Sequence, residues 1–196
     1  RITIRVDQME LSSREKKELL RIARDSIHAA LTHSPVPPSE STSKVLDTMC
    51  GVFVTLHLLG ELRGCIGYIE PRFPLREAVH EVAEKAALED PRFPPLTPGE
   101  LEQAEIEISV LSPLKQVTDV NDIIVGTHGL VVDGGYARGL LLPQVATEWG
   151  WGREQFLSQT CRKAGLQTDA WKHKKVTIYS FTSVVFSEDE LFGMKH

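Results

Sequence analysis

The sequence has 196 residues, of which 41% are hydrophobic and 25% are charged, and its formal net charge is -5. A chain of this length and apolar content can bury a substantial core, in one large domain or in two interlocked lobes. The acidic balance disfavours general nucleic-acid binding, which relies on cationic contacts to phosphate, and no apolar run approaches the roughly 20 residues of a membrane-spanning helix.

The cysteine content points to a reduced protein. Cys50, Cys65 and Cys161 are widely separated in the sequence. An odd number of cysteines without a close pair fits neither a disulfide framework nor a zinc site, and no signal-peptide pattern opens the sequence. We therefore expect a cytoplasmic protein without a metal site or a cofactor.

The first predicted helix covers residues 13–32. Ser12 is followed three residues later by Glu15, which is the pattern of a capping box, and apolar residues then recur at helical spacing. The stretch from Ser34 to Ser43 is rich in proline and serine. It predicts a surface loop and the first candidate boundary.

A β-hairpin is predicted next. Residues 51–58 are rich in β-branched and aromatic side chains, Gly60 supplies a turn, and residues 62–69 return. A helix then begins at Pro74, and it is followed by a loop from Asp90 to Leu96 that three prolines make stiff.

The register of the hairpin depends on the length of its turn. A two-residue turn places Cys65 opposite an aliphatic residue of the first strand. A three-residue turn places Cys65 opposite Thr55, and Arg63 opposite His57. The two registers predict different chemistry around the thiol, and the sequence leaves both open.

The second half of the chain alternates short strands and short helices. The strongest strand pattern, at residues 106–110, has one polar and one apolar face. The further predicted elements are a helical turn at 120–125, strands at 129–133 and 137–142, helices at 143–149 and 153–164, and a last strand at 176–186. Without regular βαβ alternation, this order predicts an α+β fold with a mainly antiparallel sheet and flanking helices.

The stretch Leu62-Arg63-Gly64-Cys65-Ile66-Gly67 is the strongest candidate for a functional site. Side chains two residues apart share one face of a strand, so Arg63 and Cys65 are expected side by side. Gly64 and Gly67 allow a ligand or another backbone to approach closely.

Two interpretations of Cys65 remain open. A neighbouring cation such as Arg63 would lower the pKa of the thiol, and Cys65 would then act as a catalytic nucleophile or redox centre. Alternatively, Cys65 is a small buried packing residue of the hairpin and Arg63 bonds nearby carbonyl groups. In a separate reading of Arg63, its guanidinium binds a carboxylate or a phosphate.

Four further residues are candidates for ligand binding. If the predicted hairpin forms, His57 and His128 are the nearest candidate bases for Cys65, although a lone histidine in a loop is usually not a site residue. Asp90 and Arg92 could rim a cleft near Arg63, or they could form a structural cap and ion pair.

The sequence resembles the AMMECR family, whose hallmark is the stretch from Leu62 to Gly67. The resemblance covers nearly the whole chain, and further matching stretches occur in the same order: Gly51–Thr55, Asp90–Leu96, Gly129–Val132, Gly139–Val145, and Cys161–Leu166 with Trp171. It implies an α+β fold with a larger and a smaller lobe. Similar prokaryotic proteins are called protein A of the AmmeMemoRadiSam system, and this label implies association with a Memo-type metalloprotein and a radical S-adenosylmethionine enzyme.

Two classes of function follow from these observations. The first is a binding or adaptor protein that holds a small anionic ligand or a protein segment in a cleft formed by Arg63, Cys65 and the Asp90–Leu96 loop. The second is an enzyme that uses Cys65 as a thiolate. A third, RNA binding, is disfavoured by the acidic charge.

Overall fold

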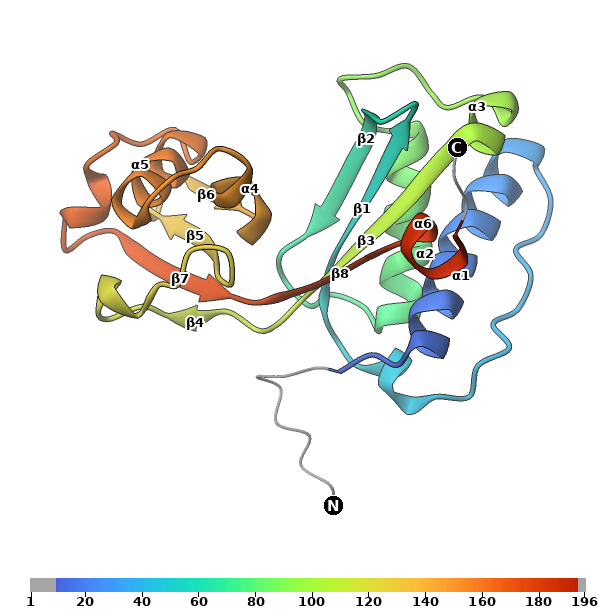
Figure 1. Cartoon of the computed structure of the whole chain (residues 1–196), viewed down its shortest axis with the longest axis horizontal. Helices are drawn as coiled ribbons and strands as arrows, with labels where there is room; N and C mark the ends of the chain where they lie inside the picture. The colour runs from blue at the N-terminus through green and yellow to red at the C-terminus, as the bar shows by residue number, and fades with distance from the viewer. Residues whose placement is uncertain (1–9, 194–196) are drawn as a thin grey trace. The chain divides into compact units, whose positions relative to one another are not determined.

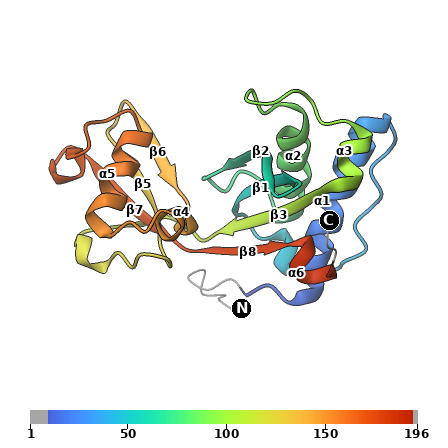
Figure 2. The same cartoon turned by 45° about the horizontal axis from the view of Figure 1, so that its top comes forward.

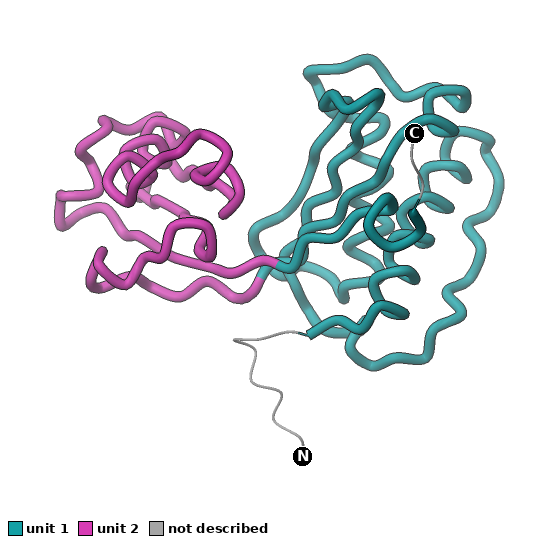
Figure 3. Tube along the Cα trace, in the orientation of Figure 1, with its two compact units in different colours: residues 1–111, 184–196 teal, residues 112–183 magenta. Residues whose placement is uncertain are grey.

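The computed structural model describes residues 10–193. The chain divides into two compact units (Figure 3): residues 1–111 with 184–196 form the first unit, and residues 112–183 form the second. In the sequence, the second unit is therefore inserted between two parts of the first. No helix in the described part of the chain is long and apolar enough to cross a membrane.

The predicted α+β class is confirmed. The helices are α1 (Ser13–Thr32), α2 (Leu75–Leu88), α3 (Pro98–Gln103), α4 (Pro143–Glu148), α5 (Arg153–Lys163) and α6 (Glu188–Phe192). Short 3-10 helices are η1 (Lys44–Asp47), η2 (Val120–Asp122) and η3 (Ala170–Lys172). The strands are β1 (Gly51–Leu58), β2 (Glu61–Tyr68), β3 (Ala104–Leu111), β4 (Lys115–Gln116), β5 (Gly129–Asp133), β6 (Arg138–Leu141), β7 (Thr177–Phe181) and β8 (Ser183–Ser187).

The first unit is a four-stranded sheet with the strand order β2-β1-β3-β8, and α1 and α2 lie on one face of it (Figures 1 and 2). Alternate side chains of the central strands point toward these helices. Val52, Val54 and Leu56 of β1 are completely buried, as are Ile106 and Ile108 of β3. The apolar stripes of α1 and α2 complete this core. We call the opposite side of the sheet its open face.

Helix α1 begins as predicted. Ser12 Oγ accepts a hydrogen bond from the Glu15 N–H at 3.2 Å, and a Glu15 carboxylate oxygen accepts one from the Ser12 N–H at 2.8 Å. This reciprocal capping box satisfies two main-chain donors that the first turn of a helix leaves unpaired. The helix ends at His33, whose φ of 54° is left-handed.

The hairpin turn has two residues. Leu58 pairs with Glu61, so only Leu59 and Gly60 lie between the strands. Their φ angles are 53° and 80°, as a tight hairpin turn with two left-handed residues requires. Glycine adopts this conformation without strain, whereas Leu59 is an uncommon residue there.

A β-bulge follows the turn. His57 pairs with Leu62, but the next pair is Leu56 with Gly64, so Arg63 is an extra residue on β2. The structure thus combines the two-residue turn of one expected register with the Cys65 pairing of the other. The expectation that Arg63 lies opposite His57 is wrong, because the bulge leaves Arg63 without a partner on β1.

The last strand differs from the prediction. Residues 176–186 were expected to form one strand, but they form β7 and β8, which belong to different sheets and are separated at Thr182. The Thr182 N–H donates to Ser112 Oγ at 2.8 Å, and the Thr182 carbonyl accepts from the Ser112 N–H at 2.8 Å. The apolar pattern continues through Thr182, so the sequence does not indicate that the chain passes from one sheet to the other there.

The second unit has its own sheet and core. Its strand order is β4-β7-β5-β6, and β5 and β6 form the predicted antiparallel hairpin. Phe156 and Leu157 of α5 are completely buried with Ile123 and Leu130. Gly165 follows α5 with a φ of 76°, consistent with its predicted role at the end of this helix.

Arg24 on α1 binds the C-terminal helix α6 through Glu188. Its Nε and Nη2 donate to the two carboxylate oxygens at 2.6 and 2.7 Å. Its Nη1 and Nη2 also donate to the carbonyl oxygens of Leu101 and Ala104 at 2.8 and 2.7 Å, and Glu188 Oε2 accepts the Ile106 N–H at 3.0 Å. Because Glu188 is only 3% exposed, this ion pair is the polar centre that joins the C-terminal segment to the rest of the first unit.

We expect Glu188→Gln to lower the free energy of unfolding by about 3 kcal/mol, because the substitution leaves the Arg24 charge without its counter-ion in a largely buried site. Urea unfolding at neutral pH measures this change. The matched control is Asp47→Asn, which removes the carboxylate of the Asp47–Arg76 pair. Asp47 is 58% exposed in its side chain, so the control should cost less than about 1 kcal/mol. Equal losses in the two variants would contradict the role of Glu188.

Candidate functional site

Cys65 lies on β2 opposite Thr55 of β1. The Thr55 hydroxyl donates a hydrogen bond to Cys65 Sγ at 3.2 Å, and the thiol is partly exposed on the open face of the sheet. On its other side, Thr55 pairs with Glu107 of β3. A thiol, a hydroxyl and a carboxylate therefore follow one another across three strands.

Asp90 and Arg92 satisfy the outer main-chain groups of Cys65. The Cys65 N–H donates to Asp90 Oδ2 at 2.9 Å, and Arg92 Nη2 donates to the Cys65 carbonyl oxygen at 3.4 Å. Strand β2 is at the edge of the sheet, where such groups would otherwise lack a neighbouring strand. The two side chains thus replace a strand at this one position.

The Asp90 carboxylate is the most strongly held group of the site. Arg92 Nε and Nη2 donate to its two oxygens at 3.0 and 2.8 Å, and the Arg92 N–H donates to Oδ1 at 3.1 Å. Asp90 is only 4% exposed. The hydrogen bonds from Arg92, followed by that from Cys65, hold the pKa of Asp90 far below its usual range, although burial acts in the opposite direction.

Arg63 is bound to Glu100 instead of to Cys65. Its Nε and Nη2 donate to the two Glu100 oxygens, each at 3.1 Å, and Nη2 also lies 3.4 Å from the Pro95 carbonyl oxygen. The ion pair with Arg63 lowers the pKa of Glu100. Arg63 is 8% exposed, and its Nη1 is buried without a hydrogen-bond partner among the described residues.

Glu100 was missed by the sequence analysis, although a signal for it exists. Thr97 and Glu100 have capping-box spacing, and both reciprocal hydrogen bonds form at the start of α3, at 2.9 and 3.2 Å. The same carboxylate therefore caps a helix and neutralises Arg63. Recognising the capping box would have predicted α3, but not the ion pair across the sequence.

Phe93 is shared by the two arginines. The guanidinium carbons of Arg63 and Arg92 lie 5.7 and 5.5 Å from the centre of its ring. These distances are typical of cation–π contacts. The 90–96 loop thus contributes an aromatic ring as well as the Asp90–Arg92 pair, so the expected proximity of this loop to Arg63 is correct.

The thiol of Cys65 is not activated by its surroundings. Burial raises its pKa, and this effect outweighs the lowering by the Thr55 hydrogen bond and by the charge of Arg92. The expectation of a lowered pKa next to Arg63 is wrong for two reasons: Arg63 is neutralised by Glu100, and the cation that acts on Cys65 is Arg92. Cys65 is therefore mainly a protonated thiol at neutral pH.

Gly64 and Gly67 are explained by close packing within the first unit. A Cβ atom at Gly64 would collide with the carbonyl oxygen of Ala86 on α2, and one at Gly67 would collide with the ring of Phe53. The expected close approach of another backbone is thus met at Gly64 by helix α2. The space beside each glycine is occupied by the chain itself.

The two histidines belong to different units, His57 to the first and His128 to the second. His57 is partly exposed, pairs with Leu62 and Glu105 on its two sides, and makes no hydrogen bond to Cys65 in the described structure. His128 belongs to the second unit, where its Nδ1 accepts the Ile124 N–H at 2.9 Å. Burial lowers the pKa of His128.

The remaining cysteines are core residues. Cys50 is 5% exposed and Cys161 is completely buried. Burial raises the pKa of Cys50 to about 11 and also raises that of Cys161. Across residues 10–193, no group of three or more histidine, cysteine or acidic side chains is arranged to hold a metal ion.

We expect Asp90→Asn to lower the free energy of unfolding at neutral pH, and the difference from the wild type to shrink in acid. The pKa of Asp90 is depressed in the folded state, so its stabilising effect is complete above the unfolded pKa of about 3.9 and is lost as the pH falls from there toward the folded pKa. Urea unfolding between neutral pH and the lowest pH at which the protein stays folded measures the difference. The exposed Glu102→Gln is the control and should leave stability within about 0.5 kcal/mol. A difference for Asp90→Asn that does not depend on pH would contradict the assignment.

Comparisons with known proteins agree on one family. The sequence profile of the AMMECR1 family matches residues 20–186. A protein of Methanothermobacter thermautotrophicus is 46% identical over 186 residues, which cover 91% of this chain and 97% of that protein. Protein TK0174 of Thermococcus kodakarensis is 43% identical, over 87% of this chain and 89% of its own. The crystal structure of the uncharacterized protein PH0010 from Pyrococcus horikoshii is similar with a TM-score of 0.83 and 41% identity, over 90% of this chain and 92% of that one. With the match extending over most of its length and a shared fold, this chain belongs to the AMMECR1 family.

Proposed function

We propose that this chain is a binding or adaptor protein, and that the surface around Cys65 receives a segment of another protein. The proposed surface consists of the open face of the first sheet at Thr55, His57 and Cys65, together with Arg92 and Phe93 of the adjoining loop. It includes Cys65 of the stretch from Leu62 to Gly67.

One observation carries this proposal: the main-chain N–H and carbonyl of Cys65 are both hydrogen-bonded to the 90–96 loop, while the residue stays partly exposed. Asp90 and Arg92 bind the N–H and the carbonyl of Cys65, and burial raises the pKa of the thiol. A catalytic cysteine requires a lowered pKa or an adjacent base. The geometry therefore favours a rigid contact surface over a nucleophile.

The charges favour a protein segment over a free small anion. Arg63 and Arg92 each have a carboxylate bound to two of their nitrogens, so neither offers a full positive charge to a second anion. Apolar side chains are exposed next to the site, where Leu59 is 77% and Leu62 is 41% exposed. Exposed apolar residues at a fixed hairpin are suited to contact with another protein.

The partners that we propose are a Memo-type metalloprotein and a radical S-adenosylmethionine enzyme. The support for them is the resemblance to prokaryotic proteins of the AmmeMemoRadiSam system. The chemistry of any reaction would then reside in these partners, and this chain would supply the contact surface.

Binding of these two partners to alkylated protein tests the proposal. A maleimide adduct on Cys65 adds bulk to the proposed surface and should weaken binding at least tenfold, or about 1.4 kcal/mol, in isothermal titration calorimetry. Cys65→Ala removes the thiol without adding bulk and should bind within about threefold of the wild type. Cys50 and Cys161 are buried, so Cys65→Ala treated with the same reagent is the control for other sites of modification.

Two outcomes would contradict the proposal. Unchanged binding after alkylation of Cys65 would place the contact surface elsewhere. Failure of Cys65→Ala to support a reaction of the assembled system, with binding intact, would favour the alternative function, an enzyme with a Cys65 thiolate.

The reactivity of Cys65 provides an independent prediction. Because the pKa of its thiol is raised, we expect the protein to react with a maleimide more slowly than free cysteine at pH 7.5. The rate should still be rising above pH 8.5, the usual thiol pKa. Stopped-flow labelling between pH 6 and pH 10 measures this profile, with Cys65→Ser as the background. A rate that reaches its plateau below pH 8 would show an activated thiolate.

A further inference from the structure

The first unit has a pocket, which we call the α1–α6 pocket, and its lining residues lie outside the surface proposed at Cys65. Its volume is about 410 Å³, which is within the range of roughly 300–1,000 Å³ that small-molecule sites occupy. One face of α1 lines it from Arg14 to Asp25, Glu40 contributes from the 34–43 loop, and Phe192 contributes from α6.

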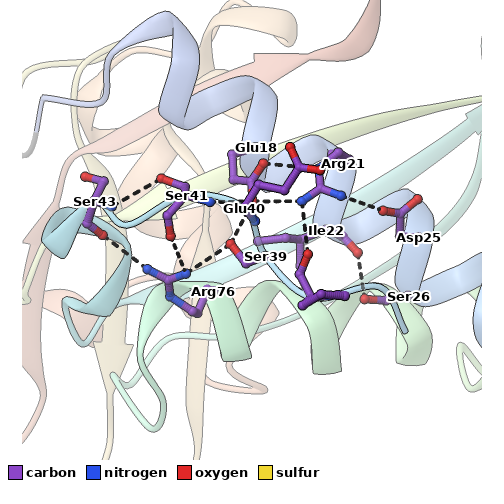
Figure 4. Close-up of polar contacts among 11 residues, drawn as sticks. Glu18, Arg21, Ile22, Asp25, Ser26, Ser39, Glu40, Ser41, Ser43 and Arg76 are labelled. Atoms are coloured by element: carbon purple, nitrogen blue, oxygen red, sulfur yellow. Dashed lines mark hydrogen bonds and ion pairs between the residues drawn. The ribbon is translucent and has the colours of Figure 1, made fainter. Parts of the chain in front are cut away.

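The wall formed by the 34–43 loop is fixed by Glu18 (Figure 4). This carboxylate accepts hydrogen bonds from Arg21, from Ser39 Oγ at 2.7 Å, and from the N–H groups of Glu40 and Ser41 at 3.0 and 3.4 Å. The hydrogen bond from Arg21 is the largest effect that lowers the pKa of Glu18 to about 2. The Glu18 carboxylate thus stays ionised and holds the loop at neutral pH.

Arg76 of α2 holds the same loop from its other side (Figure 4). Its Nη1 donates to Ser39 Oγ and to the Ser41 carbonyl oxygen at 3.0 and 3.1 Å, and its Nη2 donates to the Ser43 carbonyl oxygen at 3.2 Å. Although the loop has no regular secondary structure before η1, it is bound to both helices. The pocket is therefore formed before any ligand arrives.

The opposite wall is anchored by the Arg24–Glu188 pair described above, and it presents an aromatic ring. Phe192 is 46% exposed, and the Lys17 ammonium lies 5.6 Å from the centre of its ring. A partly exposed phenylalanine beside an ammonium offers both an apolar surface and a positive charge.

The charged side chains of the pocket are not evenly distributed along it. The Glu188 carboxylate is bound by Arg24, and the carboxylates of Glu18 and Asp25 are bound by Arg21. Within the described residues, Lys17 and Arg14 have no carboxylate within ion-pair distance. The end of the pocket at Phe192 is accordingly cationic: Glu18, Asp25 and Glu188 are bound by Arg21 and Arg24, and Glu40 contributes from the 34–43 loop, where its charge acts on Arg21.

We propose that the α1–α6 pocket binds a small organic anion with an aromatic or otherwise apolar body. The apolar body lies against Phe192 and the aliphatic parts of the α1 side chains, and the acidic group of the ligand pairs with Lys17 and Arg14. This site is independent of the surface proposed at Cys65, so an experiment that contradicts one proposal does not bear on the other.

Titration with anilinonaphthalene sulfonate tests the pocket, because this aromatic anion fluoresces when it enters an apolar site. We expect Lys17→Met to raise its dissociation constant about fivefold, the loss of one close charge interaction. Phe192→Ala should weaken binding as well, with a melting curve to confirm that the variant remains folded. The matched control is Lys44→Met, which removes an exposed lysine of the first unit outside the pocket.

A second control removes a large exposed ring of the other unit. Trp149 is 71% exposed, and Trp149→Ala should leave the fluorescence titration unchanged. Three results would overturn the proposal: wild-type affinity in Lys17→Met, an equal loss in Lys44→Met, or loss of the signal in Trp149→Ala. The last result would place the dye on the second unit.

Discussion

The hydrogen bonds that Asp90 and Arg92 make to Cys65 are the constraint on which the candidate site depends. An edge strand leaves every second residue with an unpaired N–H and carbonyl. Here an acceptor and a donor, two residues apart on a stiff loop, satisfy both groups of one residue. The carboxylate can be buried because a guanidinium binds both of its oxygens. Removing Asp90 or Arg92 would therefore leave a main-chain group of Cys65 without its hydrogen bond. It would also leave the charge of the remaining residue without its counter-ion.

Because of the bulge at Arg63, two arginines have separate roles at the site. A regular strand would direct Arg63 and Cys65 to the same face, and one guanidinium would then act on the thiol. With the extra residue, Arg63 joins β2 to Glu100 on α3, and Arg92 takes the position next to Cys65. Each arginine is thus neutralised by its own carboxylate. This division explains why Arg63 does not lower the pKa of Cys65, although the two residues are close in the sequence.

Much of the fold could be predicted from the sequence, because local signals and the final structure agree. The capping box at Ser12 and the strand alternation after Ala104 are examples. The site could be predicted only in part. The position of the 90–96 loop near Arg63 was one of two alternatives that the sequence left open. The bulge has no signature in the hairpin residues, and Arg63 and Glu100 are far apart in the sequence. The division of residues 176–186 into two strands was missed because both halves are equally apolar and β-branched.

The order of the elements also bears on how the first unit is completed. Strand β8 and helix α6 follow the whole second unit in the sequence, so the sheet order β2-β1-β3-β8 and the Arg24–Glu188 pair require the last described part of the chain. Without Glu188, the Arg24 guanidinium would have carbonyl acceptors but no counter-ion. The α1–α6 pocket depends on the same C-terminal segment, because Phe192 lies on α6. A chain that ends before residue 184 would lack both the ion pair and one wall of the pocket. The two proposed sites therefore differ in where their residues lie in the sequence: the residues of the Cys65 surface all precede residue 112, whereas the pocket takes residues from both parts of the first unit.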